Sequence, residues 1–144
     1  MSDIITSFAD EILNHFFGNA LAFATLGTGG TYPDSTFWVG LSSTLPADDG
    51  TNITEPTGGA YARVETTNAD WNIVTPRTME NATLIHFPKA TADWLSGVNL
   101  PYFVLFDALT AGTPKIKGAI TVPKKVLTND TLKHALGALK ISVP

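Results

Sequence analysis

The sequence predicts an all-β protein, an antiparallel β-sandwich of jelly-roll-like type with one N-terminal amphipathic helix. First, about eight or nine short segments rich in β-branched and aromatic residues alternate with turns, which is typical of sandwiches. Second, a helical pattern occurs only at the N-terminus, which argues against a parallel α/β sheet. The 144 residues fit a single domain. We place the helix in residues 1–19 and the sandwich in residues 36–144.

The N-terminal helix is predicted from residues 2–17, SDIITSFADEILNHFF. Apolar pairs recur every four positions and face a polar side. Ser2 suits an N-cap, and Gly18-Asn19 suits a C-terminal stop. The apolar stripe packs either on its own domain or on a neighbouring subunit, and both alternatives remain open. In the second case its interface residues are Phe8, Ile12, Phe16 and Phe17.

The predicted strands all follow residue 35. Their expected ranges are 36–42, 60–65, 71–75, 82–87, 100–107, 115–122, 124–127, 131–135 and 138–143. The run at 100–107, LPYFVLFD, is the most apolar, and we expect it to be the central strand.

A long loop is predicted at 43–59, where Pro, Asp, Asn and Gly are frequent. Loops of this length in compact domains usually bind a partner or are mobile. Its last residues, Gly58-Gly59, do not form a phosphate loop, because neither the required lysine nor a helix follows them. We therefore predict a turn with positive φ that leads into the strand at 60–65.

The composition excludes several kinds of partner. Charged residues are 15% of the chain and the net charge is −4, with no basic stripe and no basic amphipathic helix. Binding to nucleic acid or to a membrane surface is therefore not expected. Cysteine is absent, which excludes disulfides, thiol catalysis and cysteine zinc sites. So weakly charged a surface is easier to dehydrate, which hints at a subunit of an assembly.

No catalytic residue, cofactor or metal site is predicted. His15, His86 and His134 lack a second ligand at metal spacing. Asp48 and Asp49 in the long loop do not match a calcium-binding loop. The sequence contains no GxSxG nucleophile motif and no distinctive acid/base pair. We therefore do not expect an enzyme.

The aromatic residues allow two interpretations. The three tryptophans, Trp38, Trp71 and Trp94, could stack on sugars, but in a sandwich such rings more often fill the core. Trp94 lies in a turn-like segment, ATADWLSG, and we assign it to an interface. Loops 27–34 and 43–59 are candidate appendages. The remaining predicted interface residues are Tyr32, Asp48 and Asp49.

Three segments together carry a resemblance to a known family. They are FWVGLSSTLPADDGTNITEPTGGAYARV (37–64), NATLIHFPKATADW (81–94) and YFVLFDALTAG (102–112). This set resembles a family of small virion proteins of tailed bacteriophages. Some of its members resemble the jelly-roll cement proteins that decorate capsids.

The resemblance implies a virion structural protein that is made in the host cytoplasm and sits on the capsid surface. As a cement (decoration) protein it would stabilise the head by bridging capsomers. Its partners would be the major capsid protein and copies of itself, as a dimer or trimer. The alternative is a tail or fibre module that binds a host-surface glycan. The resemblance implies no catalytic residues.

Overall fold

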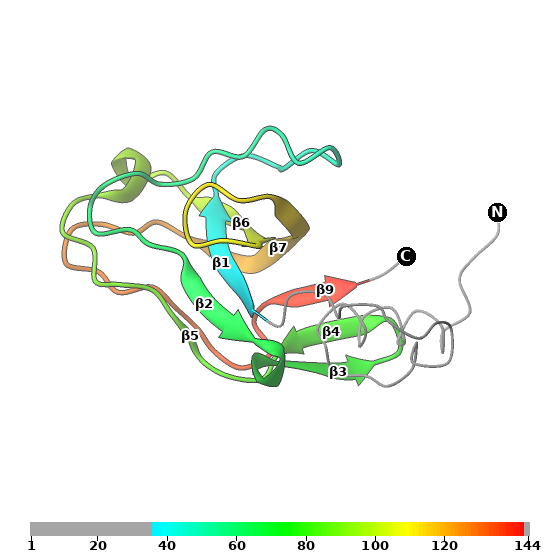
Figure 1. Cartoon of the computed structure of the whole chain (residues 1–144). Helices are drawn as coiled ribbons and strands as arrows, with labels where there is room; N and C mark the ends of the chain where they lie inside the picture. The colour runs from blue at the N-terminus through cyan, green and yellow to red at the C-terminus, as the bar shows by residue number, and fades with distance from the viewer. Residues whose placement is uncertain (1–35, 143–144) are drawn as a thin grey trace.

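The computed structural model describes residues 36–142, and these form β-structure with no α-helix among them (Figure 1). The strands are β1 (Thr36–Ser42), β2 (Val64–Thr67), β3 (Trp71–Thr75), β4 (Thr78–Asn81), β5 (Ile85–His86), β6 (Leu100–Phe106), β7 (Pro114–Lys124), β8 (Lys133–His134) and β9 (Lys140–Ser142). Two short 3-10 helices are η1 (Asn68–Asp70) and η2 (Trp94–Gly97). The all-β prediction is confirmed for this part of the chain.

The described strands form three sheets, of four, three and two strands. Their orders are β2-β1-β6-β7, β3-β4-β9 and β5-β8, and every pair is antiparallel. β6 lies inside the largest sheet, between β1 and β7, as its apolar sequence predicts. An isolated bridge between Ile120 and Leu139 joins β7 to the chain just before β9.

One face of the four-stranded sheet forms the core. Phe37, Val39 and Leu41 of β1 alternate toward this face and are at most 2% exposed. Phe103 and Leu105 of β6 join them in one hydrophobic cluster. The other sheets and the long connections contribute Trp71, Met79, Phe87, Trp94, Leu139 and Ile141. Burying a large apolar side chain stabilises the fold by about 1.5–3 kcal/mol, so this cluster holds the sheets together.

The opposite face of this sheet is covered by the chain that connects β1 to β2. A Cβ at Gly40 would lie 2.7 Å from Glu55 Oε1 and 2.8 Å from the Phe106 ring, so only glycine fits there. Lys117 Nζ of β7 donates a hydrogen bond to the Pro46 carbonyl at 2.6 Å. Figure 1 shows this connection running over the top of β1 and β6. The predicted long loop is thus confirmed, and it packs on the sheet.

The strand predicted at 60–65 begins later, at Val64. Gly58, Gly59 and Ala60 all have positive φ, and the Tyr61 N–H donates to the Gly58 carbonyl at 2.9 Å. The predicted Gly58-Gly59 turn is therefore confirmed, but it continues through Ala60 and delays the strand.

Strand boundaries between residues 76 and 87 also differ from the prediction. Only Ile85–His86 of the segment 82–87 pairs as a strand. β4 was missed because its sequence, TMEN, has one apolar residue, Met79. Its position is set by the turn after β3, where Arg77 has a φ of 64°, and by pairing with β3 and β9.

The segment predicted as a separate strand at 124–127 does not form one. Lys124 is the last residue of β7, and the Val126 carbonyl accepts a hydrogen bond from the Trp94 N–H at 3.0 Å. The predicted helix at 2–17 and the loop at 27–34 lie outside the described residues. The helix therefore stays a prediction.

Candidate functional site

The tip of the long loop carries Asp48 and Asp49, which we expected at an interface. The Asp48 side chain is 98% exposed, with Oδ1 2.6 Å from Lys117 Nζ. Asp49 Oδ1 accepts from the hydroxyl and the N–H of Thr51, at 2.6 and 3.0 Å. The Thr51 hydroxyl, and then its amide, hold the pKa of Asp49 below its usual value. Both side chains are at the surface, as an interface role requires.

The side chains around the long loop include no cluster of the kind that holds a metal ion, within the part of the chain that the structure describes. Within residues 36–142, no three His, Cys, Asp or Glu side chains lie close enough together to hold a metal ion. A small pocket of about 140 Å³ lies between the loop and β7, with Pro46, Ile53 and Lys117 among its lining residues. Asp48 also lines it, but its carboxylate is paired with Lys117.

The segment EPTGGAYAR holds a polar network beneath the loop. Arg63 makes a bidentate pair with Glu55, with Nε to Oε1 at 2.9 Å and Nη2 to Oε2 at 2.8 Å. The Tyr61 hydroxyl donates to Glu55 Oε1 at 2.6 Å and accepts from the Leu41 N–H of β1 at 2.9 Å. Burial, and then the charge of Glu55, raise the pKa of Tyr61 far above its usual value. The network ties the connection to β1.

Arg63 also reaches the turn that joins β6 to β7. Its Nη1 donates to the carbonyls of Ala108 and Ala111, both at 2.8 Å. Its guanidinium carbon lies 3.4 Å from the centroid of the Phe106 ring, a cation–π contact. Arg63 therefore joins two loops and a strand, and this part of the motif serves the fold.

Trp94 is in the core, which corrects our assignment of this ring to an interface. It is 1% exposed, and its Nε1 donates to the Gly59 carbonyl at 2.9 Å. Its ring packs edge-on against Tyr61, with the centroids 5.0 Å apart. A Cβ at Gly59 would lie 2.9 Å from the Ala92 carbonyl oxygen, so the turn and the indole fit together only with glycine. Trp71 is also 1% exposed, which agrees with a core role.

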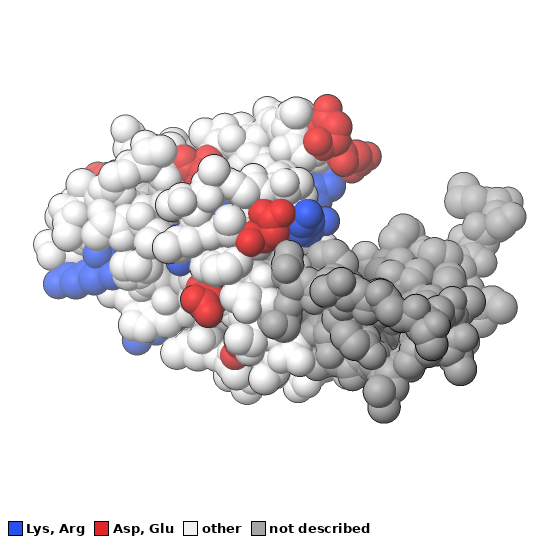
Figure 2. Space-filling model, viewed as in Figure 1, with Lys and Arg blue, Asp and Glu red and all other residues white. Residues whose placement is uncertain are grey.

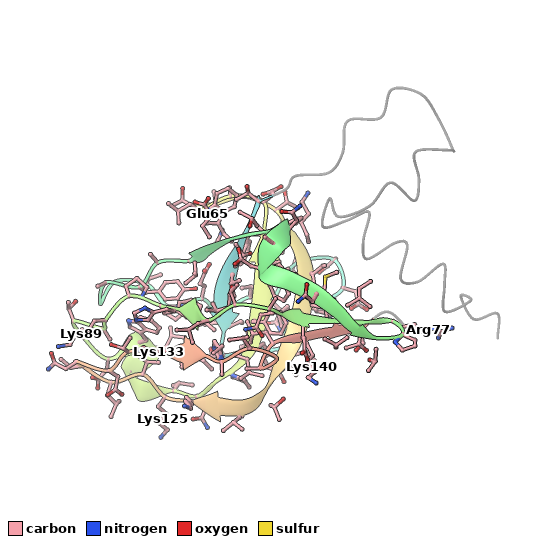
Figure 3. All side chains as sticks on the ribbon, turned by 90° about the horizontal axis from the view of Figure 1, so that it is seen from below. Glu65, Arg77, Lys89, Lys125, Lys133 and Lys140 are labelled. Atoms are coloured by element: carbon pink, nitrogen blue, oxygen red, sulfur yellow. The ribbon has the colours of Figure 1, made fainter. Side chains whose placement is uncertain are left out.

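A groove of about 490 Å³ lies between the end of β7 and residues 133–140. We call it the β7–β9 groove. Its walls include the apolar residues Ile120, Val122, Ala135 and Ala138. It is also lined by Lys124, Lys133, His134 and Lys140. Figure 3 labels Lys133 and Lys140, which lie on β8 and β9. The groove is therefore apolar inside and basic at its edge.

His134 forms part of the groove wall and is 6% exposed. Its ring packs edge-on against Phe87, with the centroids 6.1 Å apart, and its Nε2 has no hydrogen-bond partner among the described residues. Burial, and then the positive charge of Lys124, lower the pKa of His134 to about 4. The imidazole is therefore neutral at pH 7 and offers a hydrogen bond rather than a charge.

Sequence reasoning did not find this groove. In the sequence His134 showed only the lack of a second metal ligand, and the lysines are far apart along the chain. The signal that existed was the high share of basic residues after residue 114. The other predicted interface residues, Phe8, Ile12, Phe16, Phe17 and Tyr32, lie outside the described residues.

Comparison with known protein families identifies the chain's relatives. A model of the family described as "Podophage GP4 fiber I protein gp80" matches residues 3–142. The chain belongs to this family. No curated protein matches it. Membership makes it a structural protein of a phage virion, as the sequence resemblance implied, without marking it as a capsid cement protein.

The family match spans the N-terminal residues and the β-structure together. The segments that carried the resemblance, including EPTGGAYAR, supply the buried network and the Gly59–Trp94 contact.

No helix in residues 36–142 is long and apolar enough to cross a membrane.

Proposed function

We propose that this protein is a structural component of a fibre on a podophage virion. The observation that carries the proposal is the match of residues 3–142 to a family whose description names a fibre protein. In this role the β-body, which we take to be the predicted jelly-roll-like sandwich, acts by contact and not by catalysis. Fibre placement replaces the capsid surface as our first choice, because the family description does not mention a capsid.

The arrangement of charge supports a mechanical role. Glu55 and Arg63 form an ion pair that holds the long loop over β1, and their side chains are 20% and 9% exposed. Figure 2 shows that most of the described surface in view carries neither acidic nor basic side chains. A weakly charged surface on a braced body suits lasting contact with neighbouring subunits.

We propose that copies of the chain associate through the N-terminal segment. Residues 2–17 carry the apolar stripe of Phe8, Ile12 and Phe16, which needs a surface to cover it. The prediction of a dimer or trimer stays part of this proposal. Sedimentation of the full chain beside a chain lacking residues 1–19 tests it. An unchanged oligomeric state would contradict the role of the stripe.

A second candidate is the capsid cement protein, with the major capsid protein as its partner. The low charge content of 15% favours it, because a cement protein buries surface against the shell. The two candidates differ in where the protein sits. Particles are disrupted into heads and tail-fibre fractions, and the chain is quantified in each by mass spectrometry. Recovery with the fibres supports our proposal, and recovery with heads at a fixed ratio to the capsid protein supports the cement candidate and contradicts ours.

A further inference from the structure

We propose that the β7–β9 groove binds a saccharide that carries an anionic group, a carboxylate or a phosphate. The inference rests on the proposed fibre function and adds to it that this part of the fibre meets the host surface. It names the place of contact and the class of ligand.

The groove has the dimensions and the lining of a ligand site. Its volume of about 490 Å³ is in the range of roughly 300–1,000 Å³ that small-molecule sites occupy. Val122, Ala135 and Ala138 give it apolar walls, against which the C–H face of a sugar ring can pack. Val122 is 65% exposed, so part of this wall is open to a ligand from solution.

The charge of the groove selects an anion. No Asp or Glu of the described residues is among those that line it. Lys140 Nζ is 3.3 Å from Glu80 Oε2, and this carboxylate partly neutralises it. Lys124 and Lys133 have no ion-pair partner in the described part of the chain. Two free ammonium groups on one cavity attract a carboxylate or a phosphate.

His134 gives a second and independent indication of a ligand. It is one of the few buried polar residues, and its Nε2 lacks a hydrogen-bond partner among the described residues. An unpaired buried polar atom is unfavourable, and such atoms in native proteins usually pair with a water or a ligand. The Nε2 atom itself is buried in the groove wall. A sugar hydroxyl, which can both donate and accept, is a group that pairs with either tautomer of a neutral imidazole.

The position of the groove also fits recognition at a surface. It lies where β7 separates from the chain before β9, beyond the single bridge between Ile120 and Leu139. One wall comes from β7 of the four-stranded sheet, and the other includes β8, which pairs with β5. The bridge joins the β7 wall to the chain before β9. The walls are thus in place before a ligand arrives, which lowers the entropic cost of binding.

The test is isothermal titration of the full chain with four probes: oligogalacturonate, glucose 6-phosphate, a neutral cello-oligosaccharide and a poly-glutamate peptide. We expect saturable binding of one or both anionic saccharides, weakened by added salt, and no binding of the neutral one. Absence of binding to both anionic saccharides would overturn the inference. Tighter binding of the peptide at the same site would also overturn it, because the groove would then be a protein-docking site.

Variants locate the site. Lys124→Gln with Lys133→Gln should weaken the affinity about tenfold, because two charge contacts with the anionic group are lost. The matched control is Lys89→Gln with Lys125→Gln, which removes the same charge from residues that do not line the groove. Equal losses in both pairs would show a general charge effect and refute the site. Failure here leaves the fibre proposal intact, because that proposal is tested by where the protein is recovered in dissected particles.

Discussion

Arg63 makes four hydrogen bonds that join the long loop to the β6–β7 turn, so its substitution should lower stability strongly. Arg63→Met keeps most of the side-chain volume and removes two bonds to Glu55 and two to the carbonyls of Ala108 and Ala111. Glu55, which is 20% exposed, is left with the Tyr61 hydroxyl as its partner in this network. Removing one partner of a buried ion pair costs about 3–5 kcal/mol, and the partial exposure of Glu55 places this pair at the lower end.

We therefore expect Arg63→Met to lower the free energy of unfolding by about 3 kcal/mol. For a chain of this size that corresponds to a fall in Tm of roughly 6–12 °C. The assay is urea unfolding followed by tryptophan fluorescence, with Trp71 and Trp94 as buried reporters. Lys89→Met, at an exposed position, is the control and should change stability by no more than about 0.5 kcal/mol.

A double-mutant cycle tests the reason for the loss. Adding Glu55→Gln to Arg63→Met removes the unpaired charge, so the double variant should be less destabilised than the sum of the single variants by about 1 kcal/mol or more. A cost below about 1 kcal/mol for Arg63→Met, or strict additivity in the cycle, would refute the reasoning that a buried charge pair holds the loop.

Three further predictions use the same unfolding assay. Gly59→Ala should lower the free energy of unfolding by more than about 3 kcal/mol. Gly58 also has a positive φ, but a Cβ added there would meet open space, so Gly58→Ala should cost only about 1–2 kcal/mol. Equal costs for the two variants would contradict the Gly59–Trp94 contact. Trp94→Phe should lower the free energy of unfolding by about 1–3 kcal/mol, because the Gly59 carbonyl loses the indole donor and ring volume is lost. A stability equal to that of the parent would contradict the burial of Trp94 in the core. The pKa of His134 is lowered from 6.5 to about 4, so the unfolded chain takes up a proton that the folded chain refuses, and stability is full above pH 6.5 and falls as the pH falls toward 4. The loss should be about 2–3 kcal/mol and should shrink in His134→Gln, and an unchanged pH profile in that variant would contradict the burial of a neutral imidazole.

The sequence predicts best those elements whose local pattern agrees with their tertiary role. β1 and β3 have the predicted ranges, and β6 ends one residue early. These strands are rich in aromatic and β-branched residues, which favour a strand in any context. β4, with the sequence TMEN, has little such preference, and its pairing with β3 and β9 determines its conformation. Local patterns cannot show such pairing.

The motif and the groove show two other limits of sequence reasoning. The alternating positions of Tyr61 and Arg63 are typical of a strand. In the structure these residues lie in an irregular segment before β2, and both side chains bond to Glu55. The groove depends on Lys124 and Lys133, which come from different sheets and meet only through the fold. What the sequence did supply was the kind of protein, because the motif set pointed to a phage virion.

The position of the chain in the intact virion tests the central claim most directly. A cryo-electron microscopy map of the whole particle, at a resolution that separates strands, should contain density for the 36–142 β-body in a fibre, with copies repeated around its axis. Density for the same body between capsomers of the head, and none in any fibre, would contradict the account.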